Sequence, residues 1–388
     1  MPEWGGECQV STAGTMKVLN LQFEDHEIPF SFGYDCQDSI VRELMKLDAD
    51  RFILVSDRTV ESLYVWSFES KLRDAVPVLT LTSEAGEGSK TLFTLADHCE
   101  RAIGWGATRK SVVVTIGGGV PGNIGGLLAA LLFRGIRLIH IPTSVIAALD
   151  SVISLKQAVN SIHGKNLFGT YYKPSGVYVD IETFDTLPVR DRVSGTIELI
   201  KNALAVRPIG IDFLRLHLNT NAEYDANTWE TLLLEAVTTK LELMRTDHQE
   251  KKCAIVFEYG HTIGHAIELA SSRLGHGTIS HGEAVGLGML LAAKVAVRTV
   301  GLSEKAVELH CELLRKAGAA LWIPSEIKTA EIRQIVGFDN KRGYSRANAG
   351  IVPMILLEEI GRPAGPQECP LSPVPWSTIE ETIEQLRD

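Results

Sequence analysis

The chain has 388 residues, of which 45% are hydrophobic and 22% charged, and its formal net charge is −10. This length favours two domains with a sizeable core, and the acidic balance argues against a broad basic surface for nucleic acid. The longest apolar stretch, residues 124–133, is too short to span a bilayer, so we expect no membrane partner. Six dispersed cysteines without a C-x-x-C pair, and a start that lacks a signal-peptide pattern, favour a cytoplasmic protein.

The first half of the chain alternates short apolar strands with helices. Strands are predicted at residues 51–57, 76–84, 110–119 and 136–144, with a helix at 121–133 between the last two. Short, fully apolar strands in this rhythm favour a parallel sheet with helices packed on its faces. We therefore expect an α/β domain over residues 1–187.

A glycine turn, "GGGVPGN" at residues 117–123, joins one of these strands to the helix that follows. Such a turn lets phosphate oxygens approach backbone N–H groups at a helix N-terminus. The spacing differs from the usual dinucleotide fingerprint, and glycines that only make a tight turn are the alternative. Asp57, at the end of an earlier strand, is placed to bind a ribose hydroxyl or to act as a turn residue.

A polar run at residues 148–166 contains Asp150, Lys156, Asn160, Lys165 and Asn166 among apolar neighbours. Lysines are seldom buried without a partner, so two of them here suggest an anion between them. A surface hairpin with solvated lysines is the alternative.

From Pro188 onward the spacing becomes helical, in segments at 190–206, 226–247, 260–274, 282–301 and 303–318. A mainly helical domain over residues 188–388 is predicted. Near the end, a proline-rich connector at 361–376 precedes a short helix for which Ser377 is the expected cap.

Histidines mark the helical half as a candidate metal site. His261 and His265 lie one helical turn apart and face the same side, and His281 begins another helix. Glu198 and Lys201 share the face of a third helix. One Glu with two His is a common set for a catalytic divalent ion, but spacing alone does not say which two histidines bind it.

Together these segments resemble the sugar phosphate cyclases, the family of 3-dehydroquinate synthase. The motifs "GGGVPGN", "RGIRLIHIPTS", "DSVISLKQAVN", "GKN", "ELIK", "GHTIGHAIE" and "HGEA" occur in that family's order over roughly residues 17–360. The resemblance implies an N-terminal dinucleotide-binding parallel-sheet domain, a C-terminal mainly helical metal-binding domain, NAD and a divalent metal (zinc or cobalt) as cofactors, a phosphorylated sugar as substrate, and a homodimer.

The resemblance also implies roles for individual residues. The metal ligands match Glu198, His261 and His281, which leaves His265 for proton transfer. The expected substrate and catalytic positions are Lys156, Asn166, Lys201, Lys240, Glu250 and Lys341, with Arg134 reaching the neighbouring subunit's site. The expected NAD contacts are Asp57, Glu87, Lys90, Gly118, Gly119, Asn123, Thr143, Ser144, Asp150 and Lys165.

Two departures from the pattern of dehydroquinate synthases indicate the branch. Ala254 and Glu258 stand where those enzymes carry an arginine and an asparagine that hold the substrate carboxylate. An alanine cannot pair with a carboxylate, and a glutamate would repel one. A substrate without that carboxylate is implied, as in the branch that closes glucose 6-phosphate into the carbocycle of aminoglycoside antibiotics. Asn123, where dehydroquinate synthases usually carry Asp, fits the same branch.

The reaction implied is a phosphate-eliminating cyclisation with transient oxidation by NAD. Glu258 is the expected base or proton relay, with His265 as its competitor. The alternatives are 3-dehydroquinate synthase, a cyclase of sedoheptulose 7-phosphate, and a metal-dependent alcohol dehydrogenase of the same architecture.

Overall fold

The computed structural model describes residues 10–13, 16–24, 26–162, 164–275, 279–338 and 350–387. The chain forms two compact units, Met1–Leu187 with Trp229–Leu241, and Pro188–Thr228 with Glu242–Asp388. Helix α9 (Ala226–Met244) is therefore divided: Trp229–Leu241 are assigned to the first unit, and the residues at its two ends to the second. The expected assignment of NAD binding to residues 1–187 and of metal binding to residues 188–388 stays a prediction.

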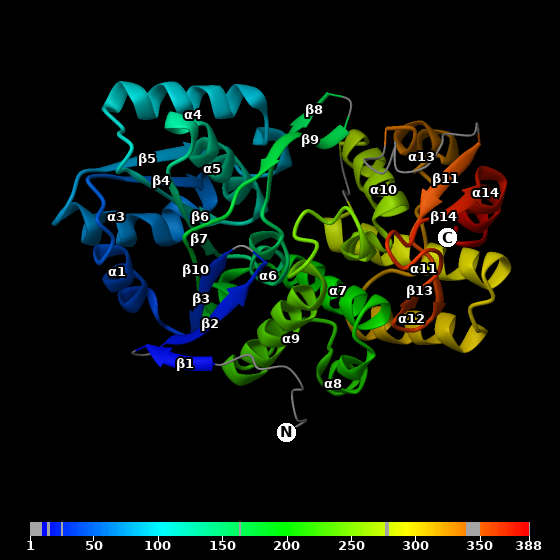
Figure 1. Ribbon diagram of the computed structural model, residues 1–388. Coiled ribbons are helices and arrows are strands. Elements are labelled where there is room, and N and C mark those ends of the chain that lie inside the picture. The colour runs from blue at the N-terminus through cyan, green and yellow to red at the C-terminus, as the bar shows by residue number, and fades with distance from the viewer. Residues whose placement is uncertain are drawn as a thin grey trace. The chain divides into compact units, whose positions relative to one another are not determined.

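The first unit is built on a sheet whose described strands follow the order β1-β2-β3-β10-β7-β6-β4-β5 (Figure 1). From β3 to β5 all neighbours are parallel, whereas β1 and β2 add antiparallel strands at one edge. The strands are β1 (Val10–Ala13), β2 (Met16–Gln22), β3 (Glu27–Gly33), β4 (Phe52–Asp57), β5 (Val78–Ser83), β6 (Val112–Gly117), β7 (Arg137–Pro142) and β10 (Gly176–Asp180).

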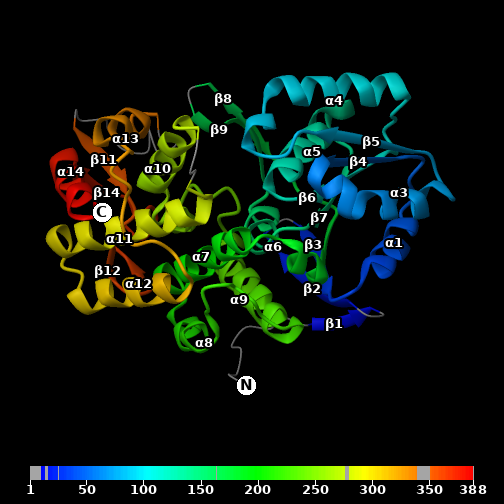
Figure 2. The same ribbon diagram turned by 180° about the vertical axis from the view of Figure 1, so that it is seen from behind.

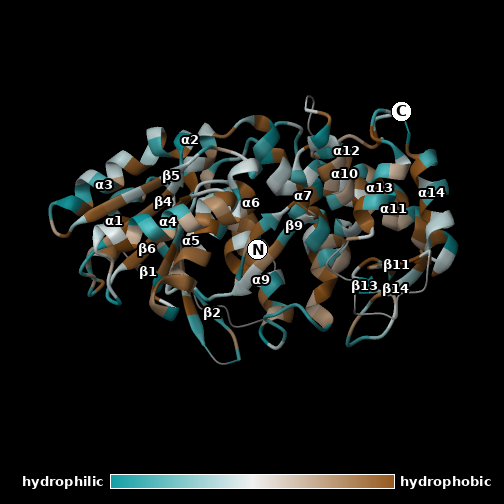
Figure 3. Ribbon diagram, turned by 90° about the horizontal axis from the view of Figure 1, so that it is seen from above, coloured by the Kyte–Doolittle hydropathy of each residue, from teal (hydrophilic) through white to brown (hydrophobic). Residues whose placement is uncertain are grey.

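Helices cover both faces of this sheet. Along β4, Phe52 and Leu54 join the core under α1 (Gln37–Met45) and α3 (Trp66–Arg73). Ile53 and Val55 join the core under α4 (Leu92–Trp105) and α5 (Gly119–Leu131). Successive side chains of a strand point to opposite faces, so a fully apolar strand needs a helix layer on each. Figures 1 and 2 show α4 on one side of the strands and α1 and α3 on the other, and Figure 3 shows hydrophobic colour along α5. The predicted parallel α/β domain is confirmed.

Short segments complete the first unit. A separate antiparallel hairpin is formed by β8 (Lys156–Ser161) and β9 (Gly164–Tyr171), and most side chains of β9 are exposed. The remaining turns are α2 (Arg58–Val60), η1 (Glu61–Val65), η2 (Glu87–Ser89), η3 (Leu132–Arg134), α6 (Val145–Leu149), η4 (Ser151–Ile153) and η5 (Ile181–Thr186).

The second unit is mainly helical, as predicted, and is organised around α11 (His281–Thr299). This helix is buried along most of its length and packs against α7, α10, α12 and α14, so its apolar residues point in all directions. The other helices are α7 (Val189–Ala205), η6 (Pro208–Gly210), α8 (Ile211–His217), η7 (Cys253–Glu258), α10 (His261–Arg273), α12 (Glu304–Lys316), α13 (Thr329–Val336) and α14 (Trp376–Gln385).

The proline-rich connector is partly ordered as strands. β11 (Ile351–Met354) pairs with β14 (Ser372–Pro375), and β12 (Leu357–Glu359) with β13 (Arg362–Pro363). Because β14 keeps the chain extended up to Pro375, α14 starts directly at Trp376. The expectation that Ser377 caps this helix is therefore wrong. Within the described ranges, every helix falls short of the length and apolarity that a bilayer crossing needs.

Candidate functional site

The start of α11 is seated directly on α7. The Ser194 hydroxyl accepts a hydrogen bond from the Gly282 N–H at 2.9 Å, and a Cβ at Gly282 would lie 2.1 Å from the Ser194 carbonyl oxygen. Only glycine allows this approach of the two backbones. Glu198 follows Ser194 by one helical turn, so the same face of α7 carries Glu198 towards the first residue of α11.

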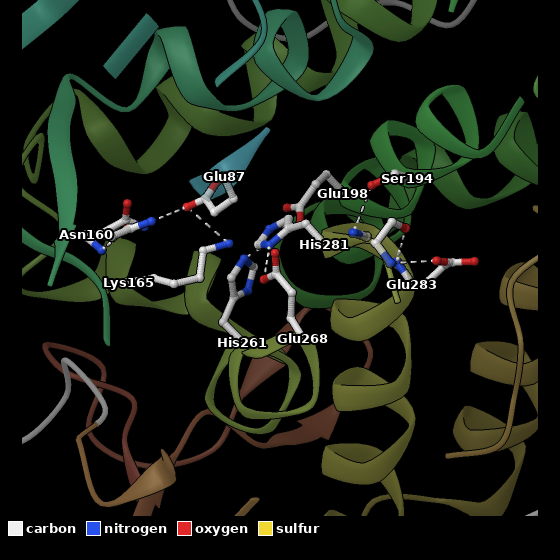
Figure 4. A network of polar contacts seen from close by, with 12 residues as sticks. Glu87, Asn160, Lys165, Ser194, Glu198, His261, Glu268, His281 and Glu283 are labelled. Atoms are coloured by element: carbon white, nitrogen blue, oxygen red, sulfur yellow. Dashed lines mark hydrogen bonds and ion pairs between the residues drawn. The ribbon is translucent and has the colours of Figure 1, made fainter. Parts of the chain in front are cut away.

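Capping interactions fix where α11 begins. Ser280 is the N-cap, and its side chain and that of Glu283 form a reciprocal capping box. Arg190 donates two hydrogen bonds to Glu283, at 3.0 and 2.7 Å. His281 is thereby held as the first residue of the helix (Figure 4).

Helix α10 starts at a second histidine because of a glycine turn. Gly260 adopts φ +80°, and a Cβ there would lie 2.6 Å from the Met289 side chain and 2.8 Å from the Val285 carbonyl oxygen. The turn makes His261 the first residue of α10, and its Nδ1 lies 3.2 Å from the Tyr259 carbonyl oxygen. Its Nε2 is left to face α7.

Glu198 and the histidines converge on one point. Glu198 Oε1 lies 3.7 Å from His261 Nε2 and 3.6 Å from His281 Nε2. This oxygen is buried and accepts no hydrogen bond from the described residues. Two ligands each about 2.1 Å from a tetrahedral ion are separated by about 3.4 Å, so the spacing fits a shared divalent cation.

His265 stands beside the same point. One ring nitrogen from each of His261, His265 and His281 lies within 4.8 Å of the others, so the geometry by itself also accommodates three histidines. The choice of Glu198, His261 and His281 as the ligand set stays a prediction.

The negative charge of Glu198 is balanced by the positive charge of Lys201. Lys201 donates to Glu198 Oε2. Burial alone would raise the pKa of Glu198, but Lys201 and the two imidazoles outweigh it and hold that pKa well below its usual range. The glutamate is therefore ionised, with Oε2 occupied by the lysine and Oε1 directed at the histidines.

The three histidines differ in their protonation without a bound ion. Burial lowers the pKa of His261 to about 4, and burial also lowers the pKa of His265 well below its usual value. Burial acts in the same direction on His281, but the carboxylates of Glu268 and Glu198 outweigh it and raise that pKa to about 10. Neutral imidazoles are metal ligands, whereas His281 has to lose a proton before it binds a cation.

The predicted catalytic glutamates lie near this cluster or on the loop before it. Burial lowers the pKa values of His261 and His265, and the charge of the Glu258 carboxylate opposes that shift in both. Glu258 is the last residue of η7, three residues before His261. Ala254 is fully buried, and its N–H donates to Asp247 at 2.9 Å. Asp247 also accepts from the N–H groups of Lys251 and Lys252, and so holds the loop on which Glu250, itself buried at φ +50°, is found.

In the first unit, the glycine turn opens α5 as predicted. Cβ atoms at Gly118 and Gly119 would lie 3.3 Å from the Ser144 hydroxyl and 3.6 Å from that of Ser151, so the glycines keep a narrow approach to the helix N-terminus clear. Ser144 caps α6, and the buried Thr143 donates its N–H to the Gly117 carbonyl at 3.0 Å.

Two residues predicted to contact NAD make hydrogen bonds within the chain. Asp57 Oδ1 accepts from Thr59 N–H and Val60 N–H, both at 3.0 Å, so it caps a helix turn. Asn123 donates to the Gly119 carbonyl at 2.7 Å and accepts from Ala158 N–H at 2.8 Å, which ties the turn to β8. Contact of either residue with NAD stays a prediction.

A charged cluster joins residues predicted to bind NAD and substrate. Lys90 Nζ donates to Asn166 Oδ1 at 2.5 Å, and Asn166 N–H donates to Asn160. Glu87 Oε1 accepts from Asn160 at 2.8 Å and pairs with Lys165 at 3.5 Å (Figure 4). Lys165 of the polar run is thus paired with a carboxylate of the chain and is not simply solvated.

The remaining predicted residues are more scattered. Lys240 pairs with Asp150 at 2.6 Å in the first unit. Lys156 begins β8 and is half-buried. Arg134 is exposed and adopts φ +67°. Lys341 lies outside the described residues.

Several residues around the metal cluster were missed by sequence reasoning. Glu268 lies 3.1 Å from His281 Nδ1, and Ser194, Arg190 and Asp247 hold the surrounding backbone. Glu268 had a detectable signal, because it follows His261 by seven residues and so shares its helical face. Arg190 and Ser194 have no local signature, since their partners Glu283 and Gly282 are distant in sequence. Asp247, in contrast, accepts from N–H groups only four to seven residues further along the chain.

Comparison with known proteins agrees with this arrangement. Residues 80–194 match the model of the 3-dehydroquinate synthase N-terminal domain, and residues 195–342 that of its C-terminal domain. A 2-deoxy-scyllo-inosose synthase of Streptoalloteichus tenebrarius is 45% identical over 374 residues, which cover 96% of each chain. The chain therefore belongs to the 3-dehydroquinate synthase family of sugar phosphate cyclases.

Solved structures are similar over nearly the whole chain. A crystal structure of 2-deoxy-scyllo-inosose synthase complexed with carbaglucose-6-phosphate, NAD⁺ and Co²⁺ has a TM-score of 0.87 at 39% identity, covering 95% of this chain and 99% of that chain. An iron-containing alcohol dehydrogenase has a TM-score of 0.65 at 13% identity, covering 92% of this chain and 97% of its own. At that identity the fold alone is shared.

Proposed function

We propose that the protein converts glucose 6-phosphate to 2-deoxy-scyllo-inosose and phosphate, as a lyase of aminoglycoside antibiotic biosynthesis. One observation carries the proposal. A buried carboxylate oxygen of Glu198 without a hydrogen bond from the described residues faces two imidazole nitrogens, and the extra carboxylate of Glu258 ends η7, three residues before His261. The similarity to 2-deoxy-scyllo-inosose synthases over almost the full chain supports it.

Glu198, His261 and His281 are the residues that would hold a divalent ion, zinc or cobalt. Their spacing and the ionised state of Glu198 fit such an ion, and Lys201 keeps Oε2 engaged so that Oε1 is presented. A bound ion would supply a Lewis acid for the oxygen at C4 of the sugar. His261 and His281 each direct Nδ1 to an oxygen acceptor, whereas in the described part of the chain no acceptor is found for His265. That difference supports His265 as a proton-transfer residue.

The glycine turn and the charged cluster of the first unit are the proposed NAD site. Gly118 and Gly119 leave the backbone N–H groups at the start of α5 accessible to a diphosphate. Glu87, Lys90, Asp150 and Lys165, with Asp57, Asn123, Thr143 and Ser144, complete the proposed set. NAD would supply a hydride acceptor and donor for C4, so that no net NADH is produced.

Glu258 is the proposed base for the C5 proton, which a ketone at C4 makes acidic. As the C5–H bond breaks, its electrons form a C5–C6 double bond and the C6–O bond to phosphate breaks. Lys156 and Asn166, with Lys240, Lys201, Glu250 and Lys341, are the proposed substrate contacts. After C4 is reduced again and the ring opens, the C5–C6 enolate attacks C1 to close the carbocycle.

The deciding experiment supplies NAD and one sugar phosphate at a time. Glucose 6-phosphate should release phosphate and give 2-deoxy-scyllo-inosose, identified by mass spectrometry and NMR, without net NADH. Phosphate release only from sedoheptulose 7-phosphate or from the dehydroquinate synthase substrate would assign one of the alternatives. NADH accumulation with a simple alcohol would assign an alcohol dehydrogenase and overturn the proposal.

We also propose a cytoplasmic homodimer. Strand β9 pairs only with β8 among the described strands and exposes Leu167, Phe168 and Tyr171, and an apolar free edge of this kind favours association. Arg134 would then serve the neighbouring subunit's site. The described cysteines are free thiols, which supports a reducing compartment. Light scattering measures the mass, and a monomer would refute the assembly.

A further inference from the structure

The His281 ring lies between two carboxylates that approach opposite nitrogens. Nε2 lies 3.6 Å from Glu198 Oε1, and Nδ1 lies 3.1 Å from Glu268 Oε2. Glu198 is on α7, His281 on α11 and Glu268 on α10, so three helices meet at one imidazole (Figure 4). The Glu268 side chain is mostly buried, at 15% exposed.

The chemistry of the imidazole makes the Nδ1 contact decisive for metal binding. A neutral imidazole carries one proton, and the nitrogen that binds a cation must be the other one. An ionised carboxylate only accepts hydrogen bonds, so Glu268 stabilises the tautomer with the proton on Nδ1. Nε2 is then left with its lone pair towards Glu198.

We propose that Glu268 is a positioning residue for the metal site: it orients His281 and selects the tautomer that binds the cation. The inference rests on the proposed function, because it assumes that Glu198, His261 and His281 hold the ion. It adds a residue that belongs to no ligand set. Partners of this kind raise the basicity of a ligating imidazole, and their removal typically lowers metal affinity about 10–100-fold.

The two histidines are not supported alike. The acceptor for His261 Nδ1 is the neutral backbone carbonyl of Tyr259. A substitution of the Tyr259 side chain would leave this carbonyl in the chain. The acceptor for His281 is a charged side chain, and charge-assisted hydrogen bonds are roughly twice as strong as neutral ones. Of these two histidines, His281 is therefore the one whose hydrogen-bond acceptor a single substitution can remove.

The test measures metal affinity directly. Full-length protein stripped of metal is titrated with Zn²⁺ against a chromophoric chelator, for the wild type, Glu268→Gln and Glu268→Leu. Gln keeps a neutral acceptor and Leu removes it, so the affinity should fall about 10-fold for Gln and about 100-fold for Leu. Co²⁺ loading provides a second readout, because a displaced His281 changes the visible absorption of the bound ion.

A matched control is available in an ion pair that the same helix makes with α13. Glu331 pairs with Arg273 at the end of α10, at 3.2 Å, so Glu331→Gln also removes a carboxylate from an ion pair of this helix. It should leave Zn²⁺ affinity unchanged. Thermal unfolding of the metal-free proteins separates a general loss of stability from weaker binding.

The outcomes distinguish this inference from the proposed function. If both Glu268 variants bind Zn²⁺ as tightly as the wild type, Glu268 does not position His281, whatever happens to their melting temperatures. A Glu198→Gln variant tests the site itself. If its Zn²⁺ affinity equals that of the wild type, the ligand assignment fails, and the inference about Glu268 fails with it.

Discussion

At the scale of residues, each side chain of the predicted metal site has two polar atoms with different tasks. One atom makes a hydrogen bond that holds the side chain in place, and the other faces the predicted position of the ion. Glu198 gives Oε2 to Lys201 and directs Oε1 at the histidines. Three of the predicted site residues, Arg134, Asn166 and Glu250, adopt positive φ, as do Asp35, Phe133, Leu155 and Ala222, for which no role is predicted. Strained backbone of this kind costs of order 1–3 kcal/mol and persists where the surroundings hold it.

Glu258 allows a direct test of proton transfer. Replacing Glu258 by Gln removes the base but keeps the size of the side chain, so turnover of glucose 6-phosphate should fall about 10²–10⁴-fold. Metal content, measured by plasma emission, should stay at the wild-type value because Glu258 is not a predicted ligand. Unchanged turnover would remove Glu258 from the mechanism and leave His265 as the candidate.

The buried His310 should make the free energy of unfolding of the second unit depend on pH. It is fully buried between the Tyr259 hydroxyl, at 2.8 Å, and the Ala306 carbonyl, at 2.7 Å, and burial lowers its pKa to about 4. The unfolded chain, with a pKa of about 6.5, binds this proton first as pH falls. The stabilisation is therefore complete above about pH 6.5 and is lost towards pH 4, by up to about 3 kcal/mol.

The measurement is urea unfolding at pH 7, 5.5 and 4.5. A His310→Gln variant should lose stability less steeply over this range, since it lacks the titrating group. Parallel curves for the two proteins would show that His310 does not contribute to the pH dependence.

At the scale of elements, the geometry of the site depends on where helices touch. Helices α7 and α11 meet backbone to backbone at Gly282, and this contact carries Glu198 to His281. The capping box then fixes the first turn of α11. Neither the Gly282 contact nor the capping box supplies a predicted ligand, but both determine the distance between Glu198 and His281.

Gly282→Ala should therefore weaken both folding and metal binding. The new methyl group would lie 2.1 Å from the Ser194 carbonyl oxygen, so α11 has to shift, at a cost of about 1–3 kcal/mol. Gly286→Ala is the control, because there the methyl group would meet only the ends of side chains, Leu314 at 3.0 Å and Ile197 at 3.6 Å, and no backbone atom among the nearest neighbours. Equal Zn²⁺ affinity for both variants would contradict the role given to the Gly282 contact.

In the first unit a buried polar chain connects β6, β7 and β8. His140 Nδ1 lies 2.7 Å from the Thr115 hydroxyl, and His140 Nε2 lies 3.4 Å from Gln157 Nε2. Burial lowers the pKa of His140 to about 4, so the ring is neutral. With its proton on Nδ1, His140 donates to Thr115 and accepts from Gln157, which satisfies both ring nitrogens.

Gln157→Leu should break this chain without changing the volume much. It leaves the buried Nε2 of His140 without a donor, so the free energy of unfolding should fall by about 1–3 kcal/mol in urea titrations. A Gln157→Leu, His140→Leu double variant should recover part of the loss, because no polar group is then left unpaired. A double variant less stable than either single one would contradict this reading.

At the scale of the whole molecule, two units with separate cores divide the proposed ligand sites between them. The predicted metal ligands belong to the second unit, and the glycine turn and the charged cluster belong to the first. A ligand stabilises what it binds by mass action, by about 2.7 kcal/mol at 100 times its Kd.

Hydrogen exchange should resolve this division. Zn²⁺ added alone should slow exchange in α7, α10 and the first turns of α11, and NAD added alone should slow exchange at the start of α5 and in the β8–β9 hairpin. Mass spectrometry of peptides locates each effect. Protection of α5 by Zn²⁺ alone, with none in α10, would contradict the assignment of the sites.

Local sequence was enough for the main elements of the first unit and for the histidine pair on one helix, whereas the other site residues were predicted from the family resemblance. The apolar strands at 52–57 and 112–117 and the helix that starts at the glycine turn are confirmed, because periodicity and turn residues act over a few positions. The ordered motifs identified the family, and with it the expected cofactors. Histidine spacing on one helix indicated a metal site.

Packing decided what remained. That residues 229–241 join the first unit, that β14 extends up to Trp376, and that Glu268 faces His281 all depend on partners distant in sequence. A helical pattern states which side of a helix is apolar, but not which other helix that side meets. The partner of a buried polar atom is set by that meeting, so only the tertiary structure could pair Glu268 with His281 and Ser194 with Gly282.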